Sequence, residues 1–264
     1  MEYYAGIDAG STYVKLVIAT HEAFLGQKVA PTGIDCCTTA RKLFGELRDE
    51  LGLLPTDIRR ITSTGYSRRL IDIADETVTE IRAHAVGASW TGPENTKVGT
   101  IIDIGGQDSK VIIIDEQGET INFAMNDKCA AGTGRFLEVI SRVLELDIDD
   151  FGPLSLKAMS PCRINSLCAV FAESEVISLL ARQTDRADII AGIHESLAKR
   201  ISGMARRVSL EPGVLLTGGV ALNPGFVSAL EDELRMDIFV AKTPQFNGAI
   251  GAAIIAGNSN EGQR

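Results

Sequence analysis

The chain has 264 residues, of which 45% are hydrophobic and 23% charged, a globular balance that excludes wholesale disorder. Its 26 Lys and Arg residues against 35 Asp and Glu residues give a net charge of −9, so we expect no binding to nucleic-acid phosphates. No stretch approaches the roughly 18 apolar residues of a membrane span. Residues 1–4 lack the features of a signal peptide, so we expect a cytoplasmic protein without membrane attachment.

Apolar runs of strand length alternate with segments of helical spacing along the first half of the chain. The elements expected there are strands at 3–7, 14–19, 58–62, 98–102 and 110–114, a helix that Asp35 caps and that runs to Leu51, and a helix at 77–90. Glycine-containing turns separate the first two strands and the last two, so each pair predicts a hairpin.

The second half is mostly helical in its spacing, with two short buried strands. The elements expected there are helices at 136–144, 171–180, 187–210, 225–234 and 247–256, and strands at 214–216 and 238–241. Residues 258–264 are typical of a frayed polar tail.

A weak internal repeat joins the two hairpins. Residues 8–15 and 103–110 both read Asp-x-Gly-x-x-x-x-Lys, each after an apolar strand. Glycine lets backbone N–H groups approach a phosphate, and an aspartate can hold Mg²⁺ through water. One copy alone would be better explained as an ordinary Gly-rich hairpin. Two copies in register favour a pair of similar domains that face each other and clamp a polyphosphate with its metal.

A third glycine-rich segment, residues 216–225, runs from a buried strand through Gly218-Gly219 into a helix, a turn on which a base or ribose could lie. No G-x-x-x-x-G-K-[ST] motif is present, so a P-loop is excluded. Residues 132–134 lack the third glycine of the dinucleotide fingerprint.

Together, the two Asp-turn segments and Thr217-Gly218-Gly219-Val220-Ala221 resemble the ATPase fold shared by actin, Hsp70 and sugar kinases. This resemblance implies an α/β protein of two related, ribonuclease H-like domains with MgATP in the cleft between them. We expect domains at 1–97 and 98–264, with the last helix, about 247–257, near the interdomain hinge.

Two of the five cysteines, Cys129 and Cys168, precede or open predicted helices, whose positive dipole ends stabilise a thiolate. An odd number in a reducing compartment disfavours a disulfide framework. Spacing alone favours two small buried hydrophobes, since neither segment has a C-x-x-C motif. A Cys₄ iron–sulfur cluster would nevertheless be complete if a two-fold dimer supplied both cysteines twice.

The residues around these cysteines closely resemble the activator ATPases of (R)-2-hydroxyacyl-CoA dehydratases and the related ATPase subunits of benzoyl-CoA reductase. The resemblance covers nearly the whole chain. The segments that carry it are 64–66, Glu80 with His84-Ala85, 103–107, 126–136, 171–178 and 245–252.

This second resemblance implies an oxygen-sensitive homodimer of an anaerobic metabolism, in which one 4Fe-4S cluster is bound by Cys129 and Cys168 of each chain. Reduced ferredoxin or flavodoxin would load the cluster, and ATP hydrolysis would change the angle between the domains. A low-potential electron would then pass to a partner iron–sulfur protein. The partner is expected to be a 2-hydroxyacyl-CoA dehydratase, a benzoyl-CoA-type reductase or a double-cubane-cluster protein.

In such an ATPase, Asp8 and Asp103 would organise Mg²⁺ and the attacking water, while Lys15 would neutralise phosphate charge or remain a solvated strand-end lysine. The expected MgATP contacts are Gly10, Ser11, Thr12, Lys15, Gly105, Gly106, Gln107, Gly218, Gly219 and Asn223. Two histidines, His84 and His194, are better explained as structural than as ligands. Roles stay open for Cys36, Cys37, Cys162, Glu173 and Glu175.

Two other interpretations compete with the activator. The first is a small-molecule kinase of the same fold, of the N-acetylhexosamine type, which would have no need of either cysteine segment. The second is a nucleotide-dependent assembly or sensor protein without redox chemistry.

Overall fold

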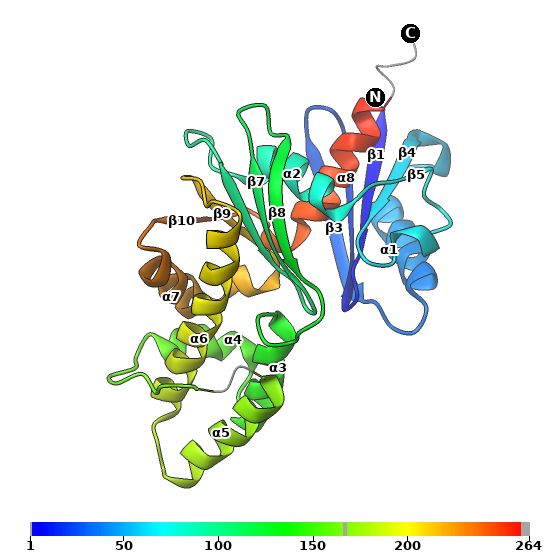
Figure 1. Ribbon diagram of the computed structural model, residues 1–264. Coiled ribbons are helices and arrows are strands. Elements are labelled where there is room, and N and C mark those ends of the chain that lie inside the picture. Colours follow the sequence, from blue (N-terminus) through cyan, green and yellow to red (C-terminus); the bar gives the residue numbers. More distant parts are fainter. Residues whose placement is uncertain (1, 166–167, 260–264) are drawn as a thin grey trace. The chain divides into compact units, whose positions relative to one another are not determined.

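The structure, a computed structural model, describes residues 2–165 and 168–259, and these pack as two compact units (Figure 1). The first unit comprises the described residues within 1–94, 114–120 and 241–264, and the second those within 95–113 and 121–240. The domain boundary expected at 97/98, and the expected place of the last helix near a hinge, stay predictions. Part of the segment around Cys168 (residues 166 and 167) and part of the predicted tail (260–264) lie outside the described residues.

A five-stranded sheet of order β3-β2-β1-β4-β5 forms the centre of the first unit. Its strands are β1 (Tyr3–Ala9), β2 (Tyr13–Ala19), β3 (Phe24–Pro31), β4 (Ile58–Thr64) and β5 (Glu76–Thr77). The helices of this unit are α1 (Cys36–Glu50), α2 (Glu80–Thr91) and α8 (Asn247–Asn258). The expected hairpin is present, because β1 and β2 pair antiparallel, and β4 then pairs with β1 in parallel.

Close packing of α8 on β1 depends on a missing side chain. A Cβ atom at Gly6 on β1 would lie 1.9 Å from the Ala249 carbonyl oxygen and 2.4 Å from the Ala253 backbone nitrogen. Backbone atoms cannot move aside as a flexible side chain can, so only glycine lets helix and strand approach this closely. The small-residue composition of α8 therefore reflects contact with the sheet.

We predict opposite effects of alanine at Gly6 and at Gly45. Gly6→Ala should destabilise the protein by about 3 kcal/mol or more, at the upper end of overpacking effects, because the clash is with backbone. Gly45 lies inside α1 with no atom within 4 Å of an added Cβ, so Gly45→Ala should stabilise by roughly 0.5–1 kcal/mol. Urea unfolding of both variants tests this. Equal midpoints for Gly6→Ala and the wild type would contradict the packing argument.

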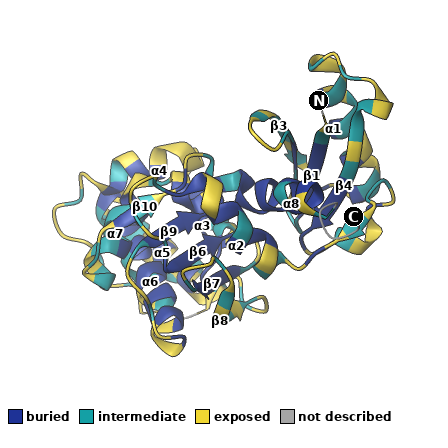
Figure 2. Ribbon diagram, turned by 90° about the horizontal axis from the view of Figure 1, so that it is seen from above, coloured by how far each residue is buried: buried dark blue, intermediate teal, exposed yellow. Residues whose placement is uncertain are grey.

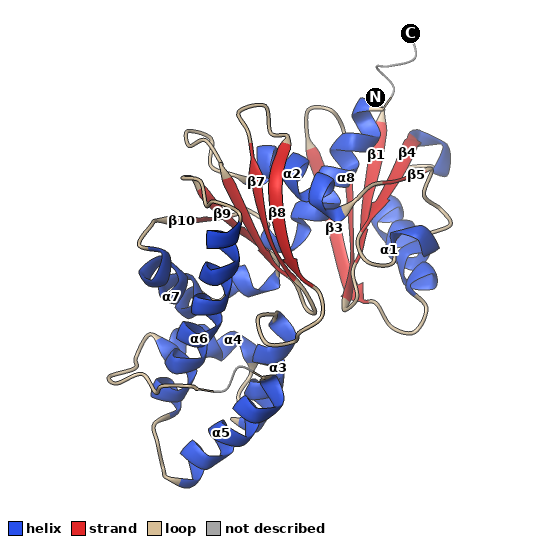
Figure 3. Ribbon diagram, viewed as in Figure 1, coloured by secondary structure: helices blue, strands red, loops and turns tan. Residues whose placement is uncertain are grey.

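The second unit repeats the sheet topology of the first (Figure 3). Its sheet has the order β10-β9-β6-β7-β8. When this order is reversed, it reads β8-β7-β6-β9-β10 and matches the order β3-β2-β1-β4-β5 of the first unit strand for strand. The strands are β6 (Thr100–Ile104), β7 (Ser109–Ile114), β8 (Thr120–Asn126), β9 (Val214–Thr217) and β10 (Ile238–Val240). The hairpin expected around Gly105-Gly106 is β6–β7, and β9 pairs with β6 in parallel. The predicted α/β class is confirmed, and the internal repeat corresponds to a repeated sheet.

Helices carry most of the apolar core of the second unit, which appears as dark blue ribbon in Figure 2. They are α3 (Gly134–Val143), α4 (Ile148–Ser155), α5 (Ala169–Ala181), α6 (Arg186–Arg207) and α7 (Pro224–Leu234). The largest fully buried side chains of this core include Phe151 and Phe226. None of the helices in the described part of the chain is long and apolar enough to cross a membrane.

The structure adds three edge strands and a helix that the sequence did not predict. Strands β3, β5 and β8 lie at sheet edges. Strand β5 has only two residues, while β3 and β8 leave apolar side chains such as Val29 and Phe123 exposed, so no apolar-inside alternation marks any of the three. Helix α4 contains Pro153, a residue that usually breaks helices. Helix α2 begins at Glu80 rather than at residue 77, because the Thr79 hydroxyl accepts the Arg82 backbone N–H as an N-cap.

Candidate functional site

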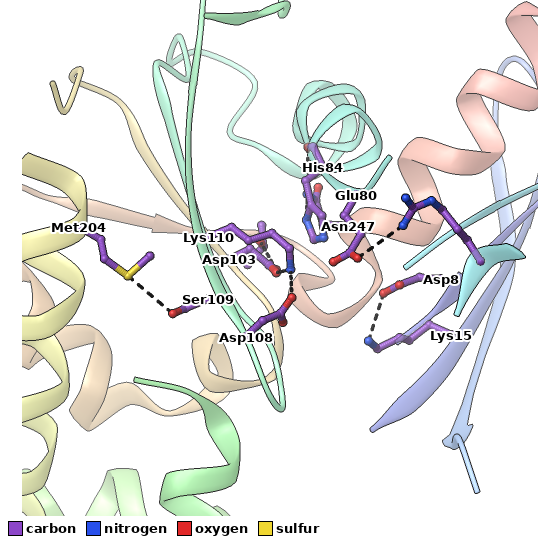
Figure 4. Close-up of polar contacts among 12 residues, drawn as sticks. Asp8, Lys15, Glu80, His84, Asp103, Asp108, Ser109, Lys110, Met204 and Asn247 are labelled. Atoms are coloured by element: carbon purple, nitrogen blue, oxygen red, sulfur yellow. Dashed lines mark hydrogen bonds and ion pairs between the residues drawn. The ribbon is translucent and has the colours of Figure 1, made fainter. Parts of the chain in front are cut away.

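In the first unit, the aspartate of the repeat lies among three strands. Asp8 on β1 is paired in register with Lys15 on β2 and with Thr64 on β4. The Lys15 ammonium Nζ lies 3.1 Å from Asp8 Oδ2, and Asp8 is only 7% exposed (Figure 4). The carboxylate is therefore charge-compensated and held at the end of a central strand.

In the second unit, Asp103 has an equivalent lysine and an equivalent threonine as neighbours. It pairs in register with Lys110 on β7 and Thr217 on β9. The Thr217 hydroxyl donates to Asp103 Oδ1 at 2.8 Å. Lys110 Nζ lies 3.4 Å from Asp103 Oδ2 and 2.6 Å from Asp108 Oδ2 (Figure 4). The Asp…Lys spacing of the sequence repeat thus places an equivalent ion pair in each sheet.

Thr64 and Thr217 pair with the two aspartates from parallel strands, and a glycine follows each of them. No other residue could replace either glycine without strain. Gly65 and Gly218 have φ values of +95° and +87°. A Cβ at Gly65 would lie 2.6 Å from Asp8 Oδ1, and one at Gly218 would lie 2.2 Å from the Ile104 carbonyl oxygen. The sequence analysis did not recognise that these two Thr-Gly turns are equivalent. The signal was present, because the Thr-Gly dipeptide follows a buried strand in both units.

Two hydrogen bonds to the backbone of Gly10 brace the first phosphate-turn candidate. The Gly10 N–H donates to the Tyr13 carbonyl at 3.1 Å, and the Thr32 hydroxyl donates to the Gly10 carbonyl at 2.8 Å. The Thr12 hydroxyl oxygen is buried and has no hydrogen-bond partner among the described residues. A buried hydroxyl without a partner costs free energy, which a ligand oxygen could offset. Ser11 is half-buried beside it.

The second turn is joined to α3. The Gly105 N–H donates to the Asp108 carbonyl, while Gly134 and Arg135, at the start of α3, donate their N–H groups to the Gly105 and Gly106 carbonyls at 2.8 Å each. These bonds couple the turn to the helix that follows the Cys129 segment. Gln107 is exposed.

The third segment is only partly open to a nucleoside. Gly218 is buried and Gly219 exposed, so a ligand has access to the second glycine. Asn223 is the N-cap of α7, where its Oδ1 accepts the Phe226 N–H at 2.9 Å, and its Nδ2 lies 3.1 Å from His194 Nε2. The Asn223 side chain is thus engaged within the unit, and a nucleoside contact by Asn223 stays a prediction.

His194 is buried, as expected of a structural histidine. It is 1% exposed, its Nδ1 lies 3.1 Å from Ser155 Oγ, and burial lowers its pKa from 6.5 to about 3. The folded state therefore holds the imidazole neutral across the physiological range.

This burial predicts acid-sensitive stability. Below pH 6.5 the unfolded chain binds a proton at His194 that the folded chain does not bind until about pH 3. The contribution of the neutral His194 to the free energy of unfolding is therefore complete above pH 6.5 and is lost as the pH falls. We expect the free energy of unfolding to fall by up to about 1.4 kcal/mol per pH unit from this group. His194→Gln should show a shallower slope in urea unfolding between pH 6.5 and 5. Parallel slopes for the two proteins would contradict the assignment.

The two helix-start cysteines differ in their surroundings. Cys168 is exposed and is the N-cap of α5. Cys129 is half-buried, with Arg200 Nη1 3.8 Å from its Sγ and with its carbonyl accepting from Asn126 Nδ2 at 2.9 Å. Cysteine binds metal through its sulfur atom, which these two residues carry outside the apolar cores. In the described residues no group of three or more His, Cys, Asp or Glu side chains could hold a metal ion, so one copy offers no complete ligand set there.

The other three cysteines have structural surroundings. Cys36, the first residue of α1, is buried in the apolar core of the first unit. The Cys37 thiol donates to Asp72 at 2.8 Å. Burial, and then the nearby charges of Asp188 and Asp185, raise the pKa of the Cys162 thiol, which disfavours its thiolate.

The solved structures that resemble this chain include an activator at high identity and a sugar kinase at low identity. The activator of the 2-hydroxyisocaproyl-CoA dehydratase from Clostridium difficile with bound ADPNP has a TM-score of 0.91 at 42% identity, and covers 97% of this chain and 95% of its own. A ROK family glucokinase from Streptomyces griseus, in complex with glucose and AMPPNP, has a TM-score of 0.59 at 14% identity and shows the fold alone. The fold is that of the actin, Hsp70 and sugar kinase ATPases.

The chain belongs to the BadF/BadG/BcrA/BcrD ATPase family, whose model matches residues 5–256. A relative named (R)-2-hydroxyglutaryl-CoA dehydratase activating ATPase, from Acidaminococcus fermentans, is 44% identical over 96% of both chains. A benzoyl-CoA reductase subunit from Thauera aromatica is 33% identical over 96% of this chain and 93% of its own. The family resemblance seen in the sequence is confirmed, and the protein is an ATPase of this family.

Proposed function

We propose that the protein is an ATP-dependent one-electron activator. A homodimer would carry one 4Fe-4S cluster and couple ATP hydrolysis to transfer of a low-potential electron from ferredoxin or flavodoxin to a partner iron–sulfur enzyme. That partner would be a 2-hydroxyacyl-CoA dehydratase, a benzoyl-CoA-type reductase or a double-cubane-cluster protein. The activator names of relatives above 40% identity support this choice, and we propose a cytoplasmic, oxygen-sensitive protein.

Nucleotide binding would use the repeated strand ends. Asp8 and Asp103 are acceptors of the kind that hold Mg²⁺ through its water ligands, and Lys15 adds a cation beside the first of them. The unpartnered Thr12 hydroxyl supports a phosphate contact at the first turn. The residues proposed to contact MgATP are Gly10, Ser11, Thr12 and Lys15 in the first unit and Gly105, Gly106, Gln107, Gly218, Gly219 and Asn223 in the second.

One observation carries the redox half of the proposal: two free thiols outside the apolar cores stand at helix-start segments, one exposed and one beside a guanidinium. Cys129 and Cys168 of each copy would together supply the four thiolates of the cluster, whose chemistry is a one-electron change of oxidation state. These residues suit the cluster by their chemistry, because thiolates are the donors that iron–sulfur clusters require. The part of one chain that the structure describes has no complete set of metal ligands, so a second copy would have to supply the rest.

The small-molecule kinase is the weaker alternative. Its support is a likeness of fold to sugar kinases at 14% identity, against relatives named as activators at 42–44% identity over nearly the whole chain. A kinase would also leave Cys129 and Cys168 without a role.

Iron and acid-labile sulfide, measured on anaerobically purified protein of known mass in solution, test the proposal. We expect about four of each per dimer, with an absorbance spectrum that bleaches in air. Protein that stays iron-free after anaerobic reconstitution would contradict the redox function and leave an ATPase.

A further inference from the structure

The two glutamates that follow Cys168 have no role in the proposed function, and the structure distinguishes them. Glu173 and Glu175 both lie on α5, and both are half-buried. Within the described part of the chain, the Glu173 carboxylate has no hydrogen-bond or ion-pair partner. The Glu175 carboxylate instead reaches back past the start of the helix to Asn165, in the segment that leads to Cys168.

Asn165 offers two donors to the Glu175 carboxylate. Its backbone N–H donates to Oε1 at 3.1 Å and to Oε2 at 3.2 Å, and its side-chain Nδ2 donates to Oε1 at 3.2 Å. A carboxylate only accepts, so the nitrogen of the Asn165 amide, and not its oxygen, faces Glu175. Hydrogen bonds to an ionised acceptor are stronger than neutral ones, so this contact ties Asn165 firmly to α5.

The contact closes a loop that contains Cys168. Asn165 precedes Cys168 by three residues, and Glu175 follows it by seven. On the helix side, the Cys168 carbonyl accepts the Ala172 N–H at 2.9 Å. Cys168 is exposed, so side-chain packing contributes little to the position of its thiol. That position therefore depends on the backbone on both sides, which α5 holds on one side and the Glu175 contact on the other.

The other end of the segment before Cys168 is held by α6. The Met159 and Ser160 N–H groups donate to Asp188 Oδ1 at 2.8 Å each, and the Cys162 N–H donates to the Asp188 carbonyl at 2.9 Å. A Cβ at Gly192 would lie 1.8 Å from the Cys162 carbonyl oxygen, so the segment lies directly against the helix. The segment is thus fixed to α6 at its start and to α5 at its end.

We propose that Glu175 is a positioning residue for the iron–sulfur cluster: it holds the backbone before Cys168 and so fixes where the thiolate meets the iron. This inference rests on the proposed function, in which Cys168 is a cluster ligand. Outer groups of this kind orient a metal ligand without touching the metal, and their loss typically lowers metal affinity about 10- to 100-fold. Glu173, which lacks such a contact, has no corresponding role.

Glu175→Gln and Glu173→Gln form a matched pair, because each removes one negative charge from a half-buried position on α5. Gln at position 175 keeps the length of the side chain but turns one acceptor oxygen into an NH₂ donor against the donors of Asn165. We expect anaerobically prepared Glu175→Gln protein to lose iron to a chelator about 10- to 100-fold faster than wild type, and Glu173→Gln to lose it at the wild-type rate. Asn165→Asp, which sets a second carboxylate against Glu175, should behave like Glu175→Gln.

A second measurement requires no cluster. In iron-free protein the Asn165 backbone N–H should be protected from hydrogen exchange in the wild type and should lose that protection in Glu175→Gln. The midpoint of urea unfolding should be the same in both proteins, since the contact is at the surface. A lowered midpoint that accounts for the iron loss would indicate a general role in stability and would overturn the proposal.

Equal exchange at Asn165 in the two proteins, or iron loss from Glu175→Gln at the wild-type rate, would also overturn it. Wild-type protein that takes up no iron would contradict the proposed function. Iron-containing wild-type protein with an equally stable cluster in Glu175→Gln would contradict this inference alone.

Discussion

Cys168→Ser protein, purified without oxygen, is expected to contain no stable iron–sulfur cluster while still binding ATP. Serine keeps the size of the side chain but replaces the soft thiolate that iron–sulfur clusters require. In a cluster shared by two copies, one substitution removes two of four ligands. Cys168 is exposed at the N-cap of α5, so the change should cost little stability.

Iron, sulfide and the visible spectrum, measured beside nucleotide affinity, check this result. Cys129→Ser should behave alike, since both residues are proposed ligands. The matched controls are Cys37→Ser and Cys162→Ser, whose thiols contact Asp72 and lie near Asp188, and both should keep full iron content. If Cys168→Ser kept about four irons per dimer, or if Cys162→Ser lost them, the ligand assignment would be wrong.

The sequence predicts the sheet centres well because their patterns are local. The β1–β2 and β6–β7 hairpins each consist of two apolar runs around a glycine turn, and the spacing from Asp8 to Lys15 and from Asp103 to Lys110 directly sets their register. The two equal spacings correspond in the structure to two equivalent ion pairs, which the sequence analysis did not predict.

What the sequence did not predict depends on contacts between distant segments. The partners Thr64 and Thr217 lie on strands that join the sheet after long crossovers, and no local pattern gives their register. His84 and Asn247 are 163 residues apart, so the hydrogen bond between their side chains exists only in the folded chain. Composition can suggest that α8 packs closely, but the position of Gly6 beneath it is a tertiary fact.

Asp103→Asn is expected to lower MgATP hydrolysis about 100-fold or more, since it removes a charge that we propose organises Mg²⁺ and the attacking water. The substitution keeps the shape of the side chain and the oxygen that accepts from Thr217. It leaves Lys110, whose side chain is 3% exposed, with the Asp108 carboxylate at 2.6 Å. Because Lys110 remains paired, the loss of stability should stay below the about 3–5 kcal/mol of an unpaired buried charge.

Asp108→Asn is the matched control, because it also removes a carboxylate from Lys110 but from the turn rather than from the end of β6. Its side chain is 22% exposed, against 5% for Asp103. We expect Asp108→Asn to retain hydrolysis within about fivefold of wild type, since the charge at the strand end remains. Steady-state hydrolysis at varied Mg²⁺, with thermal melts of each protein, decides the matter. Equal losses in the two variants would mean that the charge on Lys110, and not the position of Asp103, controls the reaction.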